Sequence, residues 1–165
     1  MMEYVKIIFL ISREQMTECS TTDQLDSRCS SIRNQLASYV ESLTKEDDSC
    51  WVGVCRIPSV FTGFEGHFPE KPILPAFCQF QLITILAERI LGVPVFLQGV
   101  SRSRFVRPIL PDRKLDLTFH LFESSALYSG SLRLTAEGAE CSEIKFKMIP
   151  LPRSSETMKT SEHPT

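Results

Sequence analysis

The feature that most restricts the fold of this chain is an apolar segment, residues 77–91, with hydrophobic side chains at nearly every helical position. Gly92 and Pro94 follow it directly, as at the end of a helix. A helix that is apolar all round has to be buried inside a domain, because a surface helix keeps one polar face. The rest of the chain must therefore supply a layer that surrounds this helix.

Short segments typical of β-strands flank the apolar helix. One of them precedes it, at residues 51–57, and four follow it. Leucine and phenylalanine alternate with polar residues in the second of the four, as in a strand with one buried face. The four are residues 95–106, 115–123, 126–136 and 142–149. Their short connections favour an antiparallel sheet, and an α+β domain with such a sheet wrapped around one buried helix accounts for both patterns.

The two ends of the chain differ in composition from this core. Apolar residues at helical spacing over residues 25–44 predict an amphipathic helix that packs on the domain or on a partner. The segment from Pro150 onwards is poor in apolar residues and predicts disorder. We therefore expect an N-terminal extension with one helix over 1–49, a single domain over 50–149 and a disordered tail over 150–165.

The overall composition argues against several functional classes. The chain has 165 residues and a formal net charge of −2, which does not favour bulk binding to nucleic acid or to anionic lipid. No apolar run approaches the ~20 residues of a membrane-spanning helix. The six cysteines form no C-x-x-C pair and the three histidines lie far apart, so no metal site is predicted. Scattered cysteines without a signal peptide favour a reducing, cytoplasmic compartment.

The loop before the apolar helix carries the most specific motif of the chain. Residues 63–81 read GFEGHFPEKPILPAFCQFQ, so that His67 is followed by three prolines spaced three apart. Each proline fixes its own φ and restricts the residue before it, which holds His67 in place relative to the start of the helix. Imidazole titrates near neutral pH, and a histidine held in this way suits the role of a catalytic base.

The stretch GHFPEKPILP, Gly66 to Pro75, resembles the active-site loop of the β-hydroxyacyl-ACP dehydratases, the FabA/FabZ group. The downstream GVSRSRFVRPILPD, residues 99–112, is similar to a second element of that family. The preceding RIPSVFTGFEGHFP, residues 56–69, looks closest to the branch that includes dehydratases of aryl-polyene pathways. The resemblance covers about residues 51–148. It implies a hot-dog fold, which agrees with the sheet and central helix inferred above, to which this chain adds an N-terminal helix.

The resemblance also implies roles for individual residues. His67 matches the catalytic histidine, which takes a proton from C2 of a 3-hydroxyacyl thioester. The backbone N–H groups of Ala76 and Phe77, at the helix start, would meet the charge on the thioester oxygen. The family usually has glycine where Ala76 stands, and its acid, an Asp or Glu, falls at Gln81. An amide cannot deliver a proton as a carboxylic acid does, so we expect Gln81 to hold the substrate hydroxyl or a water while His67 returns the proton.

Two further features lie close to these motifs. Arg102 and Arg104 are two residues apart on a predicted strand and share a face, and Arg107 follows them. Two interpretations stay open: they receive the phosphate of a phosphopantetheine arm or an acidic carrier protein, or they lie on a solvated outer face. Cys78 lies near the helix start, where thiolates are favoured, but we expect it to be a buried and inert thiol.

The sequence therefore predicts a dehydratase, a lyase, of 3-hydroxyacyl thioesters in fatty-acid or polyene type biosynthesis. By the resemblance it needs no cofactor of its own, because the substrate travels on the phosphopantetheine of an acyl carrier protein or of CoA. The expected partners are that carrier and further copies of the chain, in a homodimer or a higher homo-oligomer. Gln81 and Ala76 motivate one alternative, a non-catalytic acyl-binding or scaffold subunit. A further alternative is an acyl thioesterase, in which a water replaces the hydroxyl as the reacting group.

Overall fold

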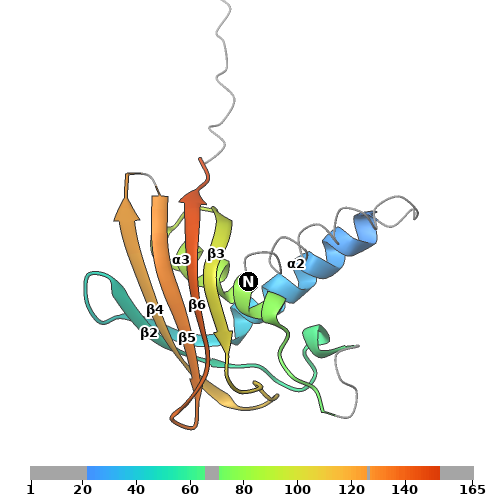
Figure 1. Cartoon of the computed structure of the whole chain (residues 1–165). Helices are drawn as coiled ribbons and strands as arrows, with labels where there is room; N and C mark the ends of the chain where they lie inside the picture. The colour runs from blue at the N-terminus through green and yellow to red at the C-terminus, as the bar shows by residue number, and fades with distance from the viewer. Residues whose placement is uncertain (1–21, 66–70, 126, 153–165) are drawn as a thin grey trace, which may run out of the picture.

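The computed structural model describes residues 22–65, 71–125 and 127–152 (Figure 1). The helices are α2 (Thr22–Tyr39), the short 3₁₀ helix η2 (Thr62–Phe64) and α3 (Ala76–Leu91), and the strands are β1 (Val40–Lys45), β2 (Cys50–Arg56), β3 (Val95–Phe105), β4 (Lys114–Ser124), β5 (Leu127–Ala136) and β6 (Ala139–Pro150). The apolar helix and the five strands that the sequence predicted are confirmed.

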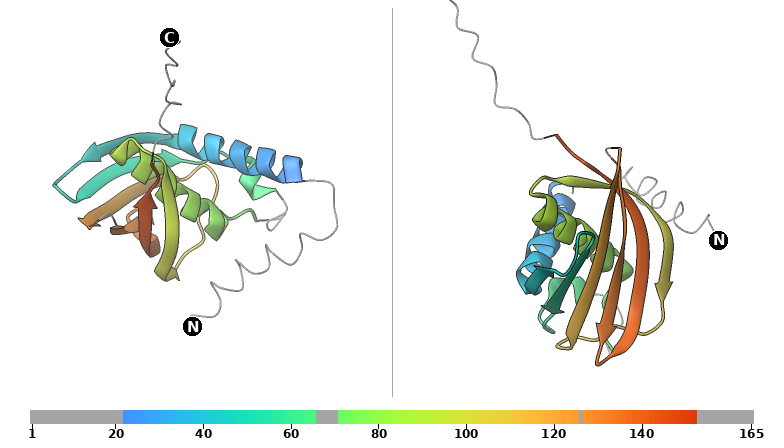
Figure 2. Two further views of the ribbon diagram at one scale, coloured as in Figure 1. Left: turned by 90° about the horizontal axis from the view of Figure 1, so that it is seen from above. Right: turned by 90° about the vertical axis from the view of Figure 1, so that its left-hand side faces the viewer.

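Within the described residues, six strands form one antiparallel sheet in the order β1-β2-β4-β5-β6-β3. β3 follows α3 in the chain but pairs with β6, so β3 forms one edge of the sheet and β1 the other. The sheet curves around α3, and α2 lies along the side of α3 that the sheet does not cover (Figure 2). The predicted sheet wrapped around a central helix, with an extra N-terminal helix, is confirmed.

The hydrophobic core lies between α3 and the inner face of the sheet. Leu82, Ile83 and Leu86 of α3 are fully buried there. The alternation in β4 places its leucines and Phe119 inward, and the ring of Phe119 stacks on that of Phe146 in β6 with 5.4 Å between the centroids. This close packing of side chains from a helix and a sheet is the main source of stability for a domain of this size.

The N-terminal helix ends earlier than predicted, and its last part is a strand. The helical spacing over 25–44 predicted one helix, whereas α2 ends at Tyr39 and Val40–Lys45 is β1, paired with β2. The register of this pair shifts between Val40 and Ser42, which lets Val40 and Leu43 face the core although they are three residues apart. A spacing of three imitates a helix, and the sheet therefore begins before residue 50.

Several predictions from the sequence fall on parts of the chain that are not described. His67 lies in the interval 66–70, and most of the predicted tail over 150–165 lies outside the described residues. In the described part of the chain, no helix is long and apolar enough to cross a membrane.

The Leu86→Ala substitution is expected to destabilise the fold by about 2–5 kcal/mol, because it opens a cavity where α3 meets the sheet. Leu86 has no exposed surface, whereas Val60, in the segment after β2, is 81% exposed and provides a matched control as Val60→Ala. Urea denaturation followed by circular dichroism measures both. Equal transition midpoints for the two variants would contradict the position of Leu86 in the core.

Candidate active site

The start of α3 has backbone donors that are not capped. Pro75 is the N-cap residue, in an extended conformation, and no side chain of the described residues caps this helix end. The N–H of Cys78 donates to the carbonyl of Pro75 over 3.1 Å. The N–H groups of Ala76 and Phe77 have no acceptor among the described residues. A helix N-terminus with two free donors is suited to bind an oxygen that carries negative charge.

The two sequence motifs meet next to this helix start. The N–H of Leu74, at the end of the proline-rich loop, donates to the carbonyl of Ile109 over 2.8 Å, and both side chains are buried. Ile109 belongs to the second motif, in the segment between β3 and β4. The N–H of Asp112, at the end of that motif, donates to the carbonyl of Ile57 after β2 over 2.8 Å. These bonds anchor the helix start to the sheet.

The segment before the interval that contains His67 is packed against the same helix end. The rings of Phe61 and Phe64 meet edge to face, with centroids 5.6 Å apart. A Cβ on Gly63 would come within 3.1 Å of the Cys78 sulfur, so η2 lies directly on the first turn of α3. The assignment of His67 as the base stays a prediction, since His67 itself is not described.

Gln81 is bonded to the N-terminal helix. Nη1 of Arg33, on α2, donates to Oε1 of Gln81 over 3.1 Å and to Oγ1 of Thr84 over 2.7 Å. Nη2 of Arg33 forms an ion pair with Glu88, whose other oxygen accepts the N–H of Val95 over 3.3 Å. Gln81, which the resemblance predicts to stand at the position of the family's acid, thus takes part in a polar cluster between two helices.

Sequence reasoning missed Arg33 and also a buried polar pair. Arg33 interrupts the apolar stripe of α2, which is the one signal that could have marked it. Gln79, in the first turns of α3, is buried and accepts a hydrogen bond of 2.6 Å from the hydroxyl of Ser142 on β6. This bond ties the helix start to the sheet from a second side.

Cys78 is a buried thiol, as predicted. Its side chain is fully buried, and this burial raises its pKa to about 12. A thiol with such a pKa carries almost no thiolate at neutral pH, and the helix N-terminus does not offset the loss of hydration. Cys78 therefore contributes packing beneath the candidate site and no nucleophile.

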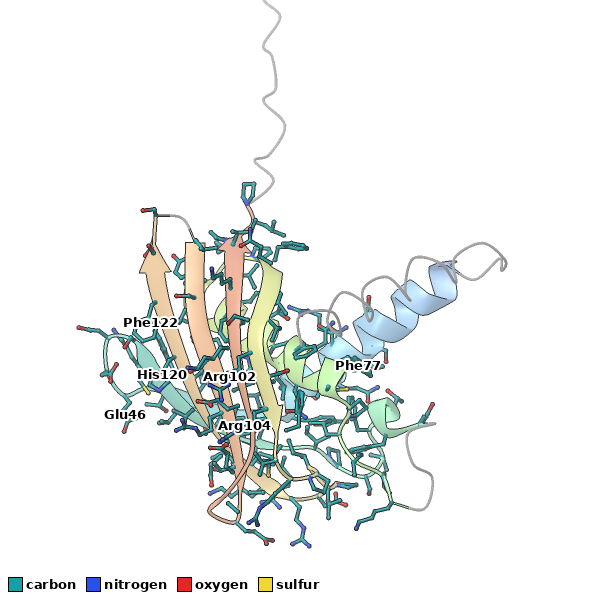
Figure 3. The ribbon with its side chains drawn as sticks, in the orientation of Figure 1. Glu46, Phe77, Arg102, Arg104, His120 and Phe122 are labelled. Atoms are coloured by element: carbon teal, nitrogen blue, oxygen red, sulfur yellow. The ribbon has the colours of Figure 1, made fainter. Side chains whose placement is uncertain are left out.

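Arg102 and Arg104 lie on the face of the sheet that points away from α3 (Figure 3). Arg102 pairs in register with Lys145 and Arg104 with Glu143, and both partners alternate with the buried residues of β6. Arg104 forms an ion pair with Glu140, which raises the pKa of Arg104. Arg102 and Arg107 have no acidic partner among the described residues, and both are exposed.

Apolar side chains are exposed near the helix start and along the neighbouring edge strand. Phe77, on α3, is 46% exposed, and Phe105, at the end of β3, is 45% exposed. Phe105 pairs in register with the buried Ser142, so it lies on the α3 side of the sheet. An unpaired strand edge flanked by exposed aromatic residues is a surface that favours association.

Comparison with protein families gives one match that covers most of the domain. The model of the ApeI-like family, described as ApeI dehydratase, matches residues 43–145. The 3-hydroxyacyl-[acyl-carrier-protein] dehydratase FabZ of Erythrobacter litoralis is 31% identical over 94 residues, which is 50% of this chain and 62% of that protein. Coronafacic acid dehydratase of Pseudomonas savastanoi pv. glycinea is 30% identical over 96 residues, 51% of this chain and 56% of that protein. The chain thus spans less than two thirds of the length of these two relatives.

Solved structures with the same fold include two at low sequence identity. The dehydratase heterocomplex ApeI:P of Xenorhabdus doucetiae superposes with a TM-score of 0.59 at 20% identity, over 67% of this chain and 96% of that one. The PaaI protein of the E. coli phenylacetic acid degradation operon gives a TM-score of 0.53 at 12% identity, over 79% of this chain and 99% of that one. These similarities confirm the hot-dog fold.

Thiol reagents are expected to leave Cys78 unmodified in the folded protein at about pH 8, because its pKa of about 12 and its burial remove both thiolate and access. Alkylation followed by peptide mass spectrometry measures this. The same reaction in denaturing urea is the control and should label Cys78 fully. Rapid labelling without denaturant would contradict the packing of η2 on α3.

Proposed function

Because the chain belongs to the ApeI-like dehydratase family, we propose that it is an enzyme that removes water from 3-hydroxyacyl thioesters. The observation that carries this proposal is the start of α3, where the backbone N–H groups of Ala76 and Phe77 have no acceptor among the described residues. Its relatives include proteins named 3-hydroxyacyl-[acyl-carrier-protein] dehydratase, which supports the same reaction class.

In this reaction the thioester oxygen binds at the start of α3. Removal of a proton from C2 moves charge onto that oxygen, and donors that are already oriented stabilise it without reorganisation. The hydrogen bonds from Leu74 to Ile109 and from Ser142 to Gln79 keep this helix end in place relative to the sheet. Alanine at position 76 keeps its backbone N–H as a donor, and its methyl group narrows the space through which the thioester approaches that donor.

His67 acts as the base in this proposal and then as the acid. Its imidazole takes the C2 proton, and the electron pair of the C2–H bond is first delocalised onto the thioester oxygen. The pair then forms the C2–C3 double bond as the C3–O bond breaks. The departing hydroxide takes the proton back from the imidazolium, so that water leaves and His67 is regenerated. Gln81 binds the hydroxyl group and holds it in line, but it transfers no proton.

The substrate is proposed to arrive on the phosphopantetheine of an acyl carrier protein or of CoA, so that the protein needs no cofactor of its own. Arg102 and Arg107 are exposed cations without an acidic partner in the described residues and suit a phosphate or an acidic carrier. Arg104 is engaged by Glu140 and is the weakest of the three candidates. The free thiols of the described cysteines fit a reducing, cytoplasmic compartment.

A second copy of the chain is the proposed partner at the β3 edge. Phe105, the last residue of β3, and Val106 directly after it are exposed, and so is Phe77 on α3. Pairing of two β3 edges would satisfy their unpaired backbone groups and cover these side chains. The apolar surface next to the start of α3 would then become an enclosed site for the acyl chain.

One observation favours a second candidate function. Gln81 cannot act as an acid, and its oxygen is already bonded to Arg33. Both the lack of an acid and the bond to Arg33 are compatible with a non-catalytic hot-dog subunit. Such a subunit would bind acyl thioesters without turnover and support an active partner. Turnover by the purified chain separates the two candidates.

The purified protein is expected to hydrate a trans-2-enoyl thioester, and the His67→Ala substitution is expected to lower kcat/KM by about 10²–10⁴-fold, the usual contribution of a general base. Absorbance of the enoyl thioester, over a panel of chain lengths on CoA and on carrier protein, measures the rate. Binding without turnover by the unmodified protein would reject the enzyme and favour the subunit.

The Phe105→Asp substitution is expected to convert a dimer into monomers, because it places a charge on the exposed apolar edge of β3. Light scattering after size-exclusion chromatography gives the mass. Phe122→Asp is the matched control, since Phe122 is 51% exposed on β4 and lies on the other face of the sheet. A monomeric unmodified protein, or a dimeric Phe105→Asp variant, would contradict the proposed pairing.

A further inference from the structure

The cluster formed by Arg33, Gln81, Thr84 and Glu88, here called the Arg33 cluster, fastens α2 to α3 at the position of the missing acid. The three residues of α3 lie at intervals of three and four, so they share one face of the helix. All three bond the same guanidinium group. α2 runs along this side of α3 (Figures 1 and 2).

The chemistry of arginine fixes the orientation of the Gln81 amide. A guanidinium has only donors, so the atom of Gln81 that faces Arg33 has to be the oxygen. The amide nitrogen of Gln81 has no hydrogen-bond partner in the described part of the chain. Gln81 can therefore offer two N–H bonds to a ligand, whereas its oxygen already accepts one bond from Arg33.

The remaining contacts hold Arg33 in this arrangement. The hydroxyl of Thr84 accepts from Arg33 and donates to the backbone carbonyl of Gln81 over 2.9 Å. Glu88 pairs with Arg33 and accepts the N–H of Val95 with its second oxygen. The side chains of Arg33 and Glu88 are 31% and 30% exposed, so water screens their pairing only in part.

We propose that Arg33 is a positioning residue, which turns the N–H₂ group of Gln81 towards the substrate hydroxyl and prevents a carboxyl group at position 81 from working as an acid. This inference rests on the proposed dehydratase function for its role in turnover. The structural part of the inference is independent of that function: a cation from α2 controls the group at position 81.

The second half of the proposal follows from charge. A carboxyl group at position 81 would face Arg33 from α2 and Glu88 from α3, and the buried thiol of Cys78 lies one turn earlier. The adjacent guanidinium favours the ionised form, and Glu88 is already paired. At neutral pH such a carboxylate accepts hydrogen bonds and has no proton to give to the leaving hydroxyl.

The test in turnover compares Gln81→Glu with the double variant Arg33→Gln/Gln81→Glu. The single variant is expected to be no faster than the unmodified protein at neutral pH, and removal of Arg33 is expected to make the double variant at least ~10-fold faster than the single one. Arg89→Gln/Gln81→Glu is the matched control. Arg89 of α3 also reaches the N-terminal part of the chain, where it donates to the carbonyls of Ala37 on α2 and Val40 on β1, but it has no hydrogen bond to Gln81. Full activity of Gln81→Glu alone would overturn the proposal.

A second measurement needs no activity. Carbon-13 NMR of the new carboxyl group in Gln81→Glu is expected to give a pKa below the ordinary glutamate value of about 4.3. Removal of Arg33 should raise it by about one pH unit or more, and the Arg89→Gln control should leave it unchanged. A value at or above the ordinary one in the single variant overturns the proposal even if the double variant does not fold. Absence of turnover in every protein, together with the lowered pKa, rejects the proposed function and retains the control of position 81 by Arg33.

Discussion

The burial of α3 against the inner face of the sheet is the constraint on which the rest of this structure depends. No part of the side chains of Leu82, Ile83 and Leu86 is exposed to solvent. The sheet therefore curves around the helix, and close packing restricts shifts and rotations of the helix. The candidate site uses this rigidity. Its donors belong to the first turn of the same helix, and they remain in position because the apolar residues behind them are fully packed.

A helix enclosed in this way still has polar groups at its ends and along one stripe. Different parts of the chain supply the hydrogen-bond partners of the start and of the stripe. The start is held by the bonds to Ile109 and Ser142, and two N–H groups there have no acceptor in the part of the chain that the structure describes. The polar stripe at Gln81, Thr84 and Glu88 would be costly against an apolar neighbour, and α2 meets it with one arginine. α2 therefore does more than cover apolar surface, because its arginine also holds the polar residues of α3 beside the candidate site.

The parts of the fold that depend on local pattern could be predicted from the sequence, and those that depend on pairing between distant residues could not. The alternation in β4 and the apolarity of α3 each reflect the preference of single side chains for the interior or for solvent. The sequence therefore predicted this strand and this helix correctly. β1 was taken for helix because a bulge gives its inward residues a spacing of three. The contact of Arg33 with Gln81 joins residues far apart in the chain, and no period or motif marks such a pair. The bonded pair of Gln79 and Ser142 was missed for the same reason.

These long-range contacts change how the glutamine should be interpreted. Taken alone, Gln81 looks like a catalytic acid that has been lost by one substitution. In the structure its oxygen accepts a hydrogen bond from a neighbouring cation that also pairs with Glu88, so this position requires a hydrogen-bond acceptor. A carboxylate would pair with Arg33 and stay ionised, so it would have no proton to give, and a hydrocarbon would leave one guanidinium N–H unpaired. The amide satisfies the arginine with its oxygen and leaves its N–H₂ group without a partner in the described residues, so the contact with α2 accounts for a glutamine at this position.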